Sequence, residues 1–168
     1  MSDNSNHDTP NSIRPVITNV NLFSPNKFIV TIDRFPKINI FLQRINVPDI
    51  YLNPVFQMSN REVDIKRPGD KLNYGSLIIS FLLDENLETF KELKDWLKRA
   101  TEEDLSNDEI FSDITIVTLT NNSNKNRTFK FYNCFPSSLS NILVDVSDRT
   151  DEPIIVDATF ETTHFDLI

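Results

Sequence analysis

Residues 61–100 constrain the fold of this chain most, because their pattern changes from strand-like to helical within one short stretch. Apolar and polar residues alternate over 62–66 and again over 76–81, as expected of two strands that each bury one face. The intervening Pro-Gly-Asp at 68–70 is typical of a tight turn. The sequence therefore predicts a β-hairpin that is followed directly by a helix.

The helix is predicted from its charges and from its apolar spacing. Asp84 suits the N-cap, and Glu85 and Glu88 place negative charge at the positive end of the helix dipole. An apolar stripe along a helix can bind a partner, but when the helix lies between strands the stripe usually packs inside the protein. The apolar stripe begins at Leu83, and the residues expected in the core with Phe81 are Leu87, Phe90, Leu93, Trp96 and Leu97.

Further strands are predicted on both sides of this block. Residues 27–33 and 38–46 are expected to pair with each other, and 114–119 to form a hairpin with 127–134. The remaining predicted strands are 142–146 and 154–165. Together these give a mainly β fold, a β-sandwich or small barrel of about seven or eight antiparallel strands with one packed α-helix.

Length and composition predict one folded domain. The chain has 168 residues, of which 39% are hydrophobic, and this suffices for a core. Residues 1–20 are polar and aperiodic, so we expect a flexible N-terminal arm followed by a single domain over 21–168. The only two glycines, Gly69 and Gly75, stand apart, which argues against a glycine-rich phosphate-binding loop.

The charge pattern bears on partners and location. A formal net charge of −8, without a run of basic residues, argues against general binding of nucleic acid. No apolar stretch approaches the roughly 20 residues of a membrane span, and the polar start of the chain lacks the apolar core of a signal peptide. We therefore expect a protein that is made in the cytoplasm and has no membrane partner.

The residues that could carry chemistry have simpler explanations. Helix capping explains the adjacent carboxylates Asp84 and Glu85 better than acid–base catalysis does. Cys134 is the only cysteine, has no base beside it in sequence, and reads as a small buried hydrophobe. Asp145, Asp148 and Asp151 do not have the spacing of a calcium-binding loop. His7 and His164 have no second histidine nearby in sequence and do not form a metal-ligand set. We predict no enzyme activity, no catalytic residue, no metal site and no cofactor.

Residues 47–58 have the composition of an extended surface segment. Pro48 and Pro54 disfavour a central strand, and Tyr51 and Phe56 lie near them in a stretch that suits contact with another subunit. An ordinary loop over the core is the alternative interpretation.

Several segments between residues 25 and 166 occur together in an order and spacing that is informative as a set. They are FIVTI at 28–32, VPDI at 47–50, Gly-Asp at 69–70, LIISFLLDE at 77–85, DWL at 95–97, FPSSL at 135–139 and ATFETT at 158–163. This pattern resembles the tail tube family of contractile-tailed bacteriophages, including the related proteins that start the tube at the baseplate.

The resemblance implies a structural virion protein of the phage tail or baseplate that forms a hexameric ring or tube. Its implied partners are copies of itself and other tail tube, baseplate hub, sheath or tape-measure proteins. Phage DNA is implied to pass through the lumen without specific binding, which a negative or neutral wall favours. By this resemblance the expected subunit interface consists of Val47, Pro48, Ile50, Tyr51, Pro54, Phe56, Pro68, Gly69 and Asp70.

The main tube subunit and the baseplate tube initiator or hub component both fit this pattern. The alternative from another class is a non-catalytic β-sandwich module that binds a peptide or protein without forming tubes. Copy number in purified particles separates the first two, and a strictly monomeric state favours the module.

Overall fold

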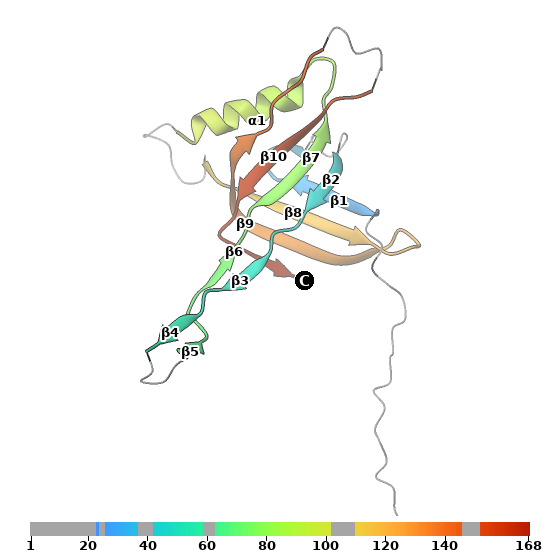
Figure 1. Ribbon diagram of the computed structural model, residues 1–168. Coiled ribbons are helices and arrows are strands. Elements are labelled where there is room, and N and C mark those ends of the chain that lie inside the picture. The colour runs from blue at the N-terminus through green and yellow to red at the C-terminus, as the bar shows by residue number, and fades with distance from the viewer. Residues whose placement is uncertain (1–22, 24–25, 37–41, 59–62, 102–109, 146–151) are drawn as a thin grey trace, which may run out of the picture.

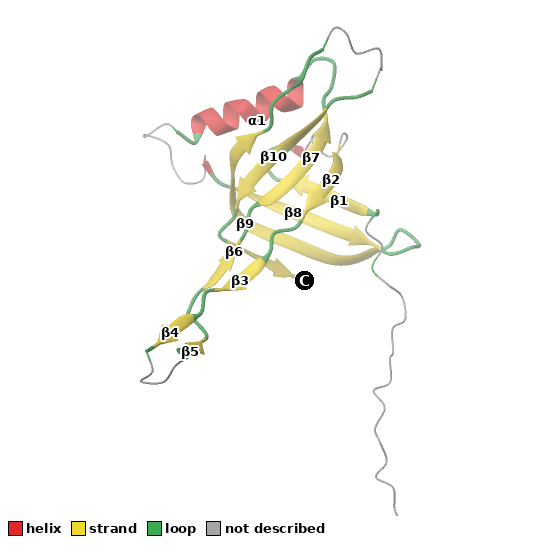
Figure 2. Cartoon of the chain, viewed as in Figure 1, coloured by secondary structure: helices red, strands yellow, loops and turns green. Residues whose placement is uncertain are grey.

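The computed structural model describes residues 23, 26–36, 42–58, 63–101, 110–145 and 152–168, shown in Figure 1 and, by secondary structure, in Figure 2. The predicted N-terminal arm at 1–20 lies outside this part of the chain. The elements are β1 (Phe28–Ile32), β2 (Leu42–Asn46), β3 (Ile50–Leu52), β4 (Val55–Gln57), β5 (Ile65–Arg67), β6 (Leu72–Tyr74), β7 (Leu77–Leu82), α1 (Glu88–Arg99), β8 (Ser112–Leu119), β9 (Lys125–Leu139), β10 (Ile155–Glu161) and β11 (His164–Leu167).

Seven of the strands form one antiparallel sheet in the order β1-β8-β9-β10-β7-β2, with β11 also paired to β9. Strand β9 is 15 residues long and belongs to two halves of this sheet. Its residues 125–134 pair with β8 and β11, whereas residues 135–139 pair with β10. We call β1, β8, β11 and the first part of β9 sheet A, and we call β10, β7, β2 and the second part of β9 sheet B.

One hydrophobic core lies between sheet A, sheet B and the helix. The strands of the two sheets cross at a steep angle in Figure 1, with α1 above them. The largest fully buried side chains come from all three parts and include Ile32, Phe81, Trp96, Ile114, Phe131 and Phe160. The expected mainly β fold with one packed helix is confirmed.

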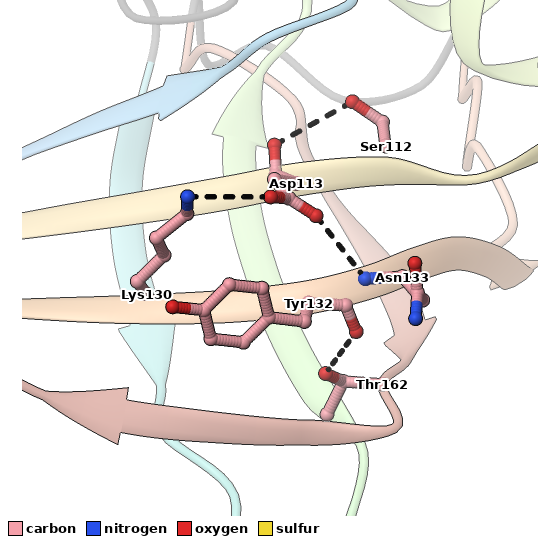
Figure 3. Close-up of polar contacts among 6 residues, drawn as sticks. All are labelled: Ser112, Asp113, Lys130, Tyr132, Asn133 and Thr162. Carbon is pink, nitrogen blue, oxygen red and sulfur yellow. Dashed lines mark hydrogen bonds and ion pairs between the residues drawn. The ribbon is translucent and has the colours of Figure 1, made fainter. Parts of the chain in front are cut away.

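A small polar cluster fixes the point where β9 passes from sheet A to sheet B (Figure 3). Asn133 has φ 53°, a left-handed conformation that asparagine tolerates better than most residues. Its N–H donates to the Asp113 carboxylate at 3.2 Å, and the same carboxylate forms an ion pair with Lys130 at 3.5 Å. The Thr162 hydroxyl donates to the Tyr132 carbonyl at 3.1 Å, which ties the turn before β11 to the same place.

The helix begins later than the sequence predicts. It starts at Glu88, after Leu87 in a left-handed conformation with φ 54°. Asp84 still caps it, because its carboxylate accepts the N–H groups of Glu88 at 2.9 Å and Thr89 at 3.4 Å. These hydrogen bonds, that from Glu88 foremost, lower the pKa of the Asp84 carboxyl.

The structure buries only part of the predicted core. Phe81, Leu93 and Trp96 are buried, whereas Phe90 and Leu97 are half-buried. The core prediction for Leu87 is wrong: its side chain is 42% exposed, because the residue precedes the helix and does not continue the apolar stripe.

The predicted strand pairings are right in one place and wrong in others. The hairpin of 114–119 with 127–134 is confirmed as the β8–β9 pair. However, β1 pairs with β8 and β2 pairs with β7, so the predicted pairing of 27–33 with 38–46 is wrong. Residues 142–145 form no strand, and the predicted last strand is divided into β10 and β11 at residues 162–163.

A candidate assembly interface

The most exposed feature of the molecule is a two-stranded ribbon that projects from sheet B (Figure 1). In it β3 pairs with β6, and further out β4 pairs with β5. We call this ribbon, which comprises residues 49–58 and 63–75, the arm. Its exposed large apolar side chains are Ile50, Tyr51, Leu52, Val55, Phe56, Met58, Val63, Ile65 and Leu72. A two-stranded ribbon is marginally stable in water, and so many exposed apolar side chains make the arm a candidate surface for contact with a partner.

The arm replaces the hairpin that the sequence predicts around residues 68–70. That prediction is wrong, because β7 pairs with β10 and β2 and not with the strand before the turn. Pro54 and Pro68 instead lie in the gaps between the two short ladders, where the missing N–H of proline removes no ladder bond.

Both glycines lie where the two strands of the arm come too close together to leave room for a side chain. A Cβ atom on Gly69 would lie 2.2 Å from the carbonyl oxygen of Asn53, and one on Gly75 would lie 2.1 Å from a carboxylate oxygen of Asp49. Gly75 also donates its N–H to the Asp49 carbonyl at 3.0 Å. Gly69 is therefore a contact between paired segments and not the tip of a turn.

The structure brings most of the predicted interface residues together on the arm and at its base. Val47, Ile50, Tyr51, Pro54, Phe56, Pro68 and Asp70 are exposed, and Gly69 is half-buried. Pro48 is buried within the single subunit, so its assignment to the interface stays a prediction that the exposed surface does not support. Sequence reasoning missed Val63 and Ile65, because their alternation with polar residues resembled a half-buried strand of the body, and it missed Leu72, which lies outside that alternation.

Sheet B has two unpaired edges among the described strands. On one side β2 pairs only with β7, and on the other side residues 135–139 of β9 pair only with β10. Sheet A does not cover the second edge, since β8 pairs with β9 only as far as Cys134. Unpaired edges expose N–H and C=O groups that another strand can complete.

The outward face of sheet B carries two carboxylates held by serines. Asp157 and Glu161 alternate along β10 with buried Val156, Ala158 and Phe160, so they point away from the core. The Ser80 hydroxyl donates to the Asp157 carboxylate at 2.5 Å. The Ser76 and Ser137 hydroxyls donate to the Glu161 carboxylate at 2.8 Å and 3.4 Å. The same face also carries exposed Arg44, which pairs with Ser80, and the apolar residues Ile78 and Ile155.

The described residues offer little for other chemistry. They contain no group of three or more His, Cys, Asp or Glu residues placed to hold a metal ion. Burial raises the pKa of the Cys134 thiol to about 11, which makes it a poor nucleophile. His164 stacks on Tyr132 with ring centroids 4.7 Å apart, while His7, Asp148 and Asp151 lie outside the described residues.

No helix within the described parts of the chain is long and apolar enough to cross a membrane.

Comparisons with known proteins give structural matches only. No family model matches the chain, and no curated protein matches it. A chain of the anti-feeding prophage baseplate matches with a TM-score of 0.68 and 14% identity, covering 88% of this chain and 96% of that chain.

Two matches come from an extracellular contractile injection system, PVC, in its extended state. A chain of its sheath–tube complex has a TM-score of 0.66 and 17% identity, with 88% and 91% of the two chains covered. A chain of its sheath/tube terminator has a TM-score of 0.68 and 19% identity, with 89% and 99% covered. The chain therefore has the fold of contractile tail tube proteins, over nearly its whole length.

Proposed function

We propose that this protein is a structural subunit of a contractile tail and that its copies join through sheet B into a hexameric ring or tube. The observation that carries the proposal is the pair of unpaired edges on a four-stranded antiparallel sheet. The tail tube fold supports the same role, because the matches cover most of this chain and nearly all of those chains.

The direction of the strands makes such a ring physically sound. In the order β9-β10-β7-β2 each strand runs opposite to the next, so the two edge strands of sheet B also run in opposite directions. A rotated second copy then places residues 135–139 of its β9 antiparallel to β2 of the first. Antiparallel ladders accept this junction without a change of pattern, and a head-to-tail contact repeated by rotation closes into a ring.

The outward face of sheet B is the proposed wall of the channel. In a closed ring one face of the continuous sheet points to the axis, and the opposite face of sheet B is already covered by the core. The serine-bound carboxylates Asp157 and Glu161 then repeat around the axis and repel the phosphates of DNA, while Arg44 on the same face offsets part of this negative charge. DNA passes such a wall without specific binding, in accordance with the net charge of −8.

The arm is proposed to contact neighbouring subunits through its exposed apolar side chains. Phe56, 59% exposed, and Tyr51, 47% exposed, are the aromatic anchors of this surface. Sheath, baseplate hub, terminator and tape-measure proteins are the further partners of a subunit in this position. The protein is a component of the tail or baseplate and has no catalytic role.

A disulfide between the two edges tests the ring. Gln43, the extra residue at the bulge between Leu42 and Arg44 of β2, and Ser138 of β9 are both exposed, and they lie nearly opposite each other when the two edge strands are paired at their centres. Opposed residues of antiparallel strands have Cα atoms about 4.5–5.5 Å apart, within reach of a disulfide. The variant Gln43→Cys with Ser138→Cys should give a ladder of covalent oligomers ending at the hexamer, and each single variant should not.

Negative-stain microscopy and mass photometry of the wild-type protein give the independent measurement. Rings or tubes are expected, and a strictly monomeric species at high concentration, without cross-linking, contradicts the proposal and favours a protein-binding module. Mass spectrometry of purified particles then separates the main tube subunit, present in many copies, from an initiator or hub component present as a single ring.

A further inference from the structure

The arm leaves the body of the subunit through a narrow junction. Strand β7 pairs with β10 and β2 inside sheet B, but these two ladders end at the pairs Leu77–Phe160 and Ile78–Asn46. Past these pairs, β6 and β3 are the only described strands that continue, and they form the base of the ribbon (Figure 1). A two-stranded ribbon has no further strand beside it to resist bending, so the arm can change its direction at this junction.

The contacts of neighbouring residues locate the hinge at Gly75. Ser76 is still bound to the body, because its hydroxyl donates to the carboxylate of Glu161 in β10 at 2.8 Å. Gly75 is the next residue toward the arm tip, and its N–H donates to the Asp49 carbonyl at 3.0 Å. This bond joins the two strands of the ribbon to each other and not to the body. A residue in this position, at the end of an element, can take up the change of backbone angles that bending requires.

An aromatic contact connects the two sides of this hinge. The ring of Tyr74 in β6 meets the ring of Phe165 in β11 edge to face, with centroids 5.4 Å apart. Phe165 in turn packs against the buried ring of Phe131 at 5.0 Å. Tyr74 is half-buried, whereas every residue of β3, β4 and β5 is exposed. Since β11 pairs with β9 in sheet A, the contact attaches the arm to strands that do not lead into it.

We infer that the contact between Tyr74 and Phe165 fixes the direction of the arm, so that the arm meets a neighbouring copy already oriented. The inference rests on the proposed role of the arm in assembly. An arm that bends freely at Gly75 must lose this freedom on docking, and the loss weakens the association. An arm held by Tyr74 has lost it already on folding. Tyr74 is then a positioning residue, because it acts through the arm and is not one of its exposed side chains.

Pulsed EPR measures the direction of the arm in the single subunit. Spin labels at Gln57→Cys in β4 and Lys91→Cys in α1, both exposed positions, report the distance between arm and body. The otherwise unchanged protein and Tyr74→Phe, which keeps the ring, should give one narrow distance distribution, and Tyr74→Ala should give a wider one. Leu72→Ala, at an exposed position of the same strand, is the control and should leave the width unchanged. Native Cys134 is buried and stays unlabelled near neutral pH.

The same contact can be removed from the other side. Phe165→Leu loses the ring but keeps an apolar side chain against the core, so it should widen the distribution as Tyr74→Ala does. The double variant should widen it no further, because both changes remove one and the same contact. In mass photometry, Tyr74→Ala should raise the concentration needed for ring formation about two- to tenfold, the equilibrium effect of one lost aromatic pair. Tyr74→Phe should leave this concentration unchanged.

The two measurements separate this inference from the proposed ring. Equal widths for Tyr74→Ala and the unchanged subunit would overturn the inference and leave the ring standing. A wider distribution with unchanged assembly would also overturn it, since docking would then not depend on the direction of the arm. If the wild-type protein stays monomeric, the ring proposal fails, and the widths alone support or overturn the role of Tyr74 in holding the arm.

Discussion

Replacing Trp96 measures how strongly the helix is bound to the sheets. The side chain is 1% exposed, and its ring centroid lies 5.3 Å from that of Phe35 and 5.8 Å from that of Phe160. Its N–H is bonded to the carbonyl of Ile110. Truncating a buried large aromatic residue costs about 3–5 kcal/mol of unfolding free energy. Because two ring contacts and a hydrogen bond are lost as well, Trp96→Ala should cost about 4–5 kcal/mol.

Trp96→Phe separates the apolar part of this contribution from the polar part. It keeps most of the buried ring but leaves the Ile110 carbonyl without its donor, so a loss of about 2 kcal/mol is expected. Urea unfolding followed by far-UV circular dichroism measures both variants, since the protein has only one tryptophan and the variants lose its fluorescence.

Leu143→Ala, at an exposed position, is the control and should change the unfolding free energy by less than about 0.5 kcal/mol. A cost below about 1 kcal/mol for Trp96→Ala would refute the packing argument. A Trp96→Phe variant as stable as the wild type would instead show that the bond to Ile110 contributes nothing to stability.

Three further predictions concern the arm, the helix start and the buried thiol. Tyr51→Ala with Phe56→Ala should leave the melting temperature of the subunit nearly unchanged and abolish assembly, and equal hydrogen-exchange protection of the arm in free and assembled protein would contradict this. Asp84→Ala should cost about 1 kcal/mol near pH 7. Because the pKa of Asp84 is lowered in the folded state, the stability that its carboxylate contributes is fully present above pH 3.8, the ordinary pKa, and is lost as the pH falls through the folded-state pKa. Acid unfolding of the wild type and of Asp84→Ala measures this difference in stability. Cys134 should react with a thiol reagent at pH 8 only on unfolding, since burial raises its pKa to about 11, and rapid reaction of the native protein would show that the site is open.

The sequence predicts best those elements whose partner lies nearby in the chain. The β8–β9 hairpin follows from two alternating segments joined by a polar turn, and its register is set locally. The helix is equally clear, although its start is not, because Asp84 caps N–H groups from a position ahead of the left-handed Leu87. Only the backbone conformation at that residue shows that the apolar stripe begins after it.

The arm shows where sequence reasoning reaches its limit. Ile65 alternates with charged residues as a strand of the body does, and the Pro-Gly-Asp at 68–70 has the composition of a turn, yet both belong to a ribbon with exposed apolar side chains. Alternation indicates that one face becomes covered, but it does not say whether the same subunit or another one covers it. The outward face of sheet B and the free edges of that sheet depend on long-range strand order, which alternation leaves open.

Because β9 belongs to both sheet A and sheet B, it also affects the order in which the sheets fold. The β8–β9 hairpin closes a short loop, whereas β7 must find β10 across the chain, pairing Leu82 with Ile155, and β1 must find β8, pairing Phe28 with Thr118. Loop-closure entropy grows with the length of the loop, and non-local strand pairs slow folding. The hairpin that forms first already contains the strand on which both sheets grow. We therefore expect sheet B to be completed late, so that a chain acquires its second edge only once it has nearly finished folding, and incomplete subunits are kept out of the growing assembly.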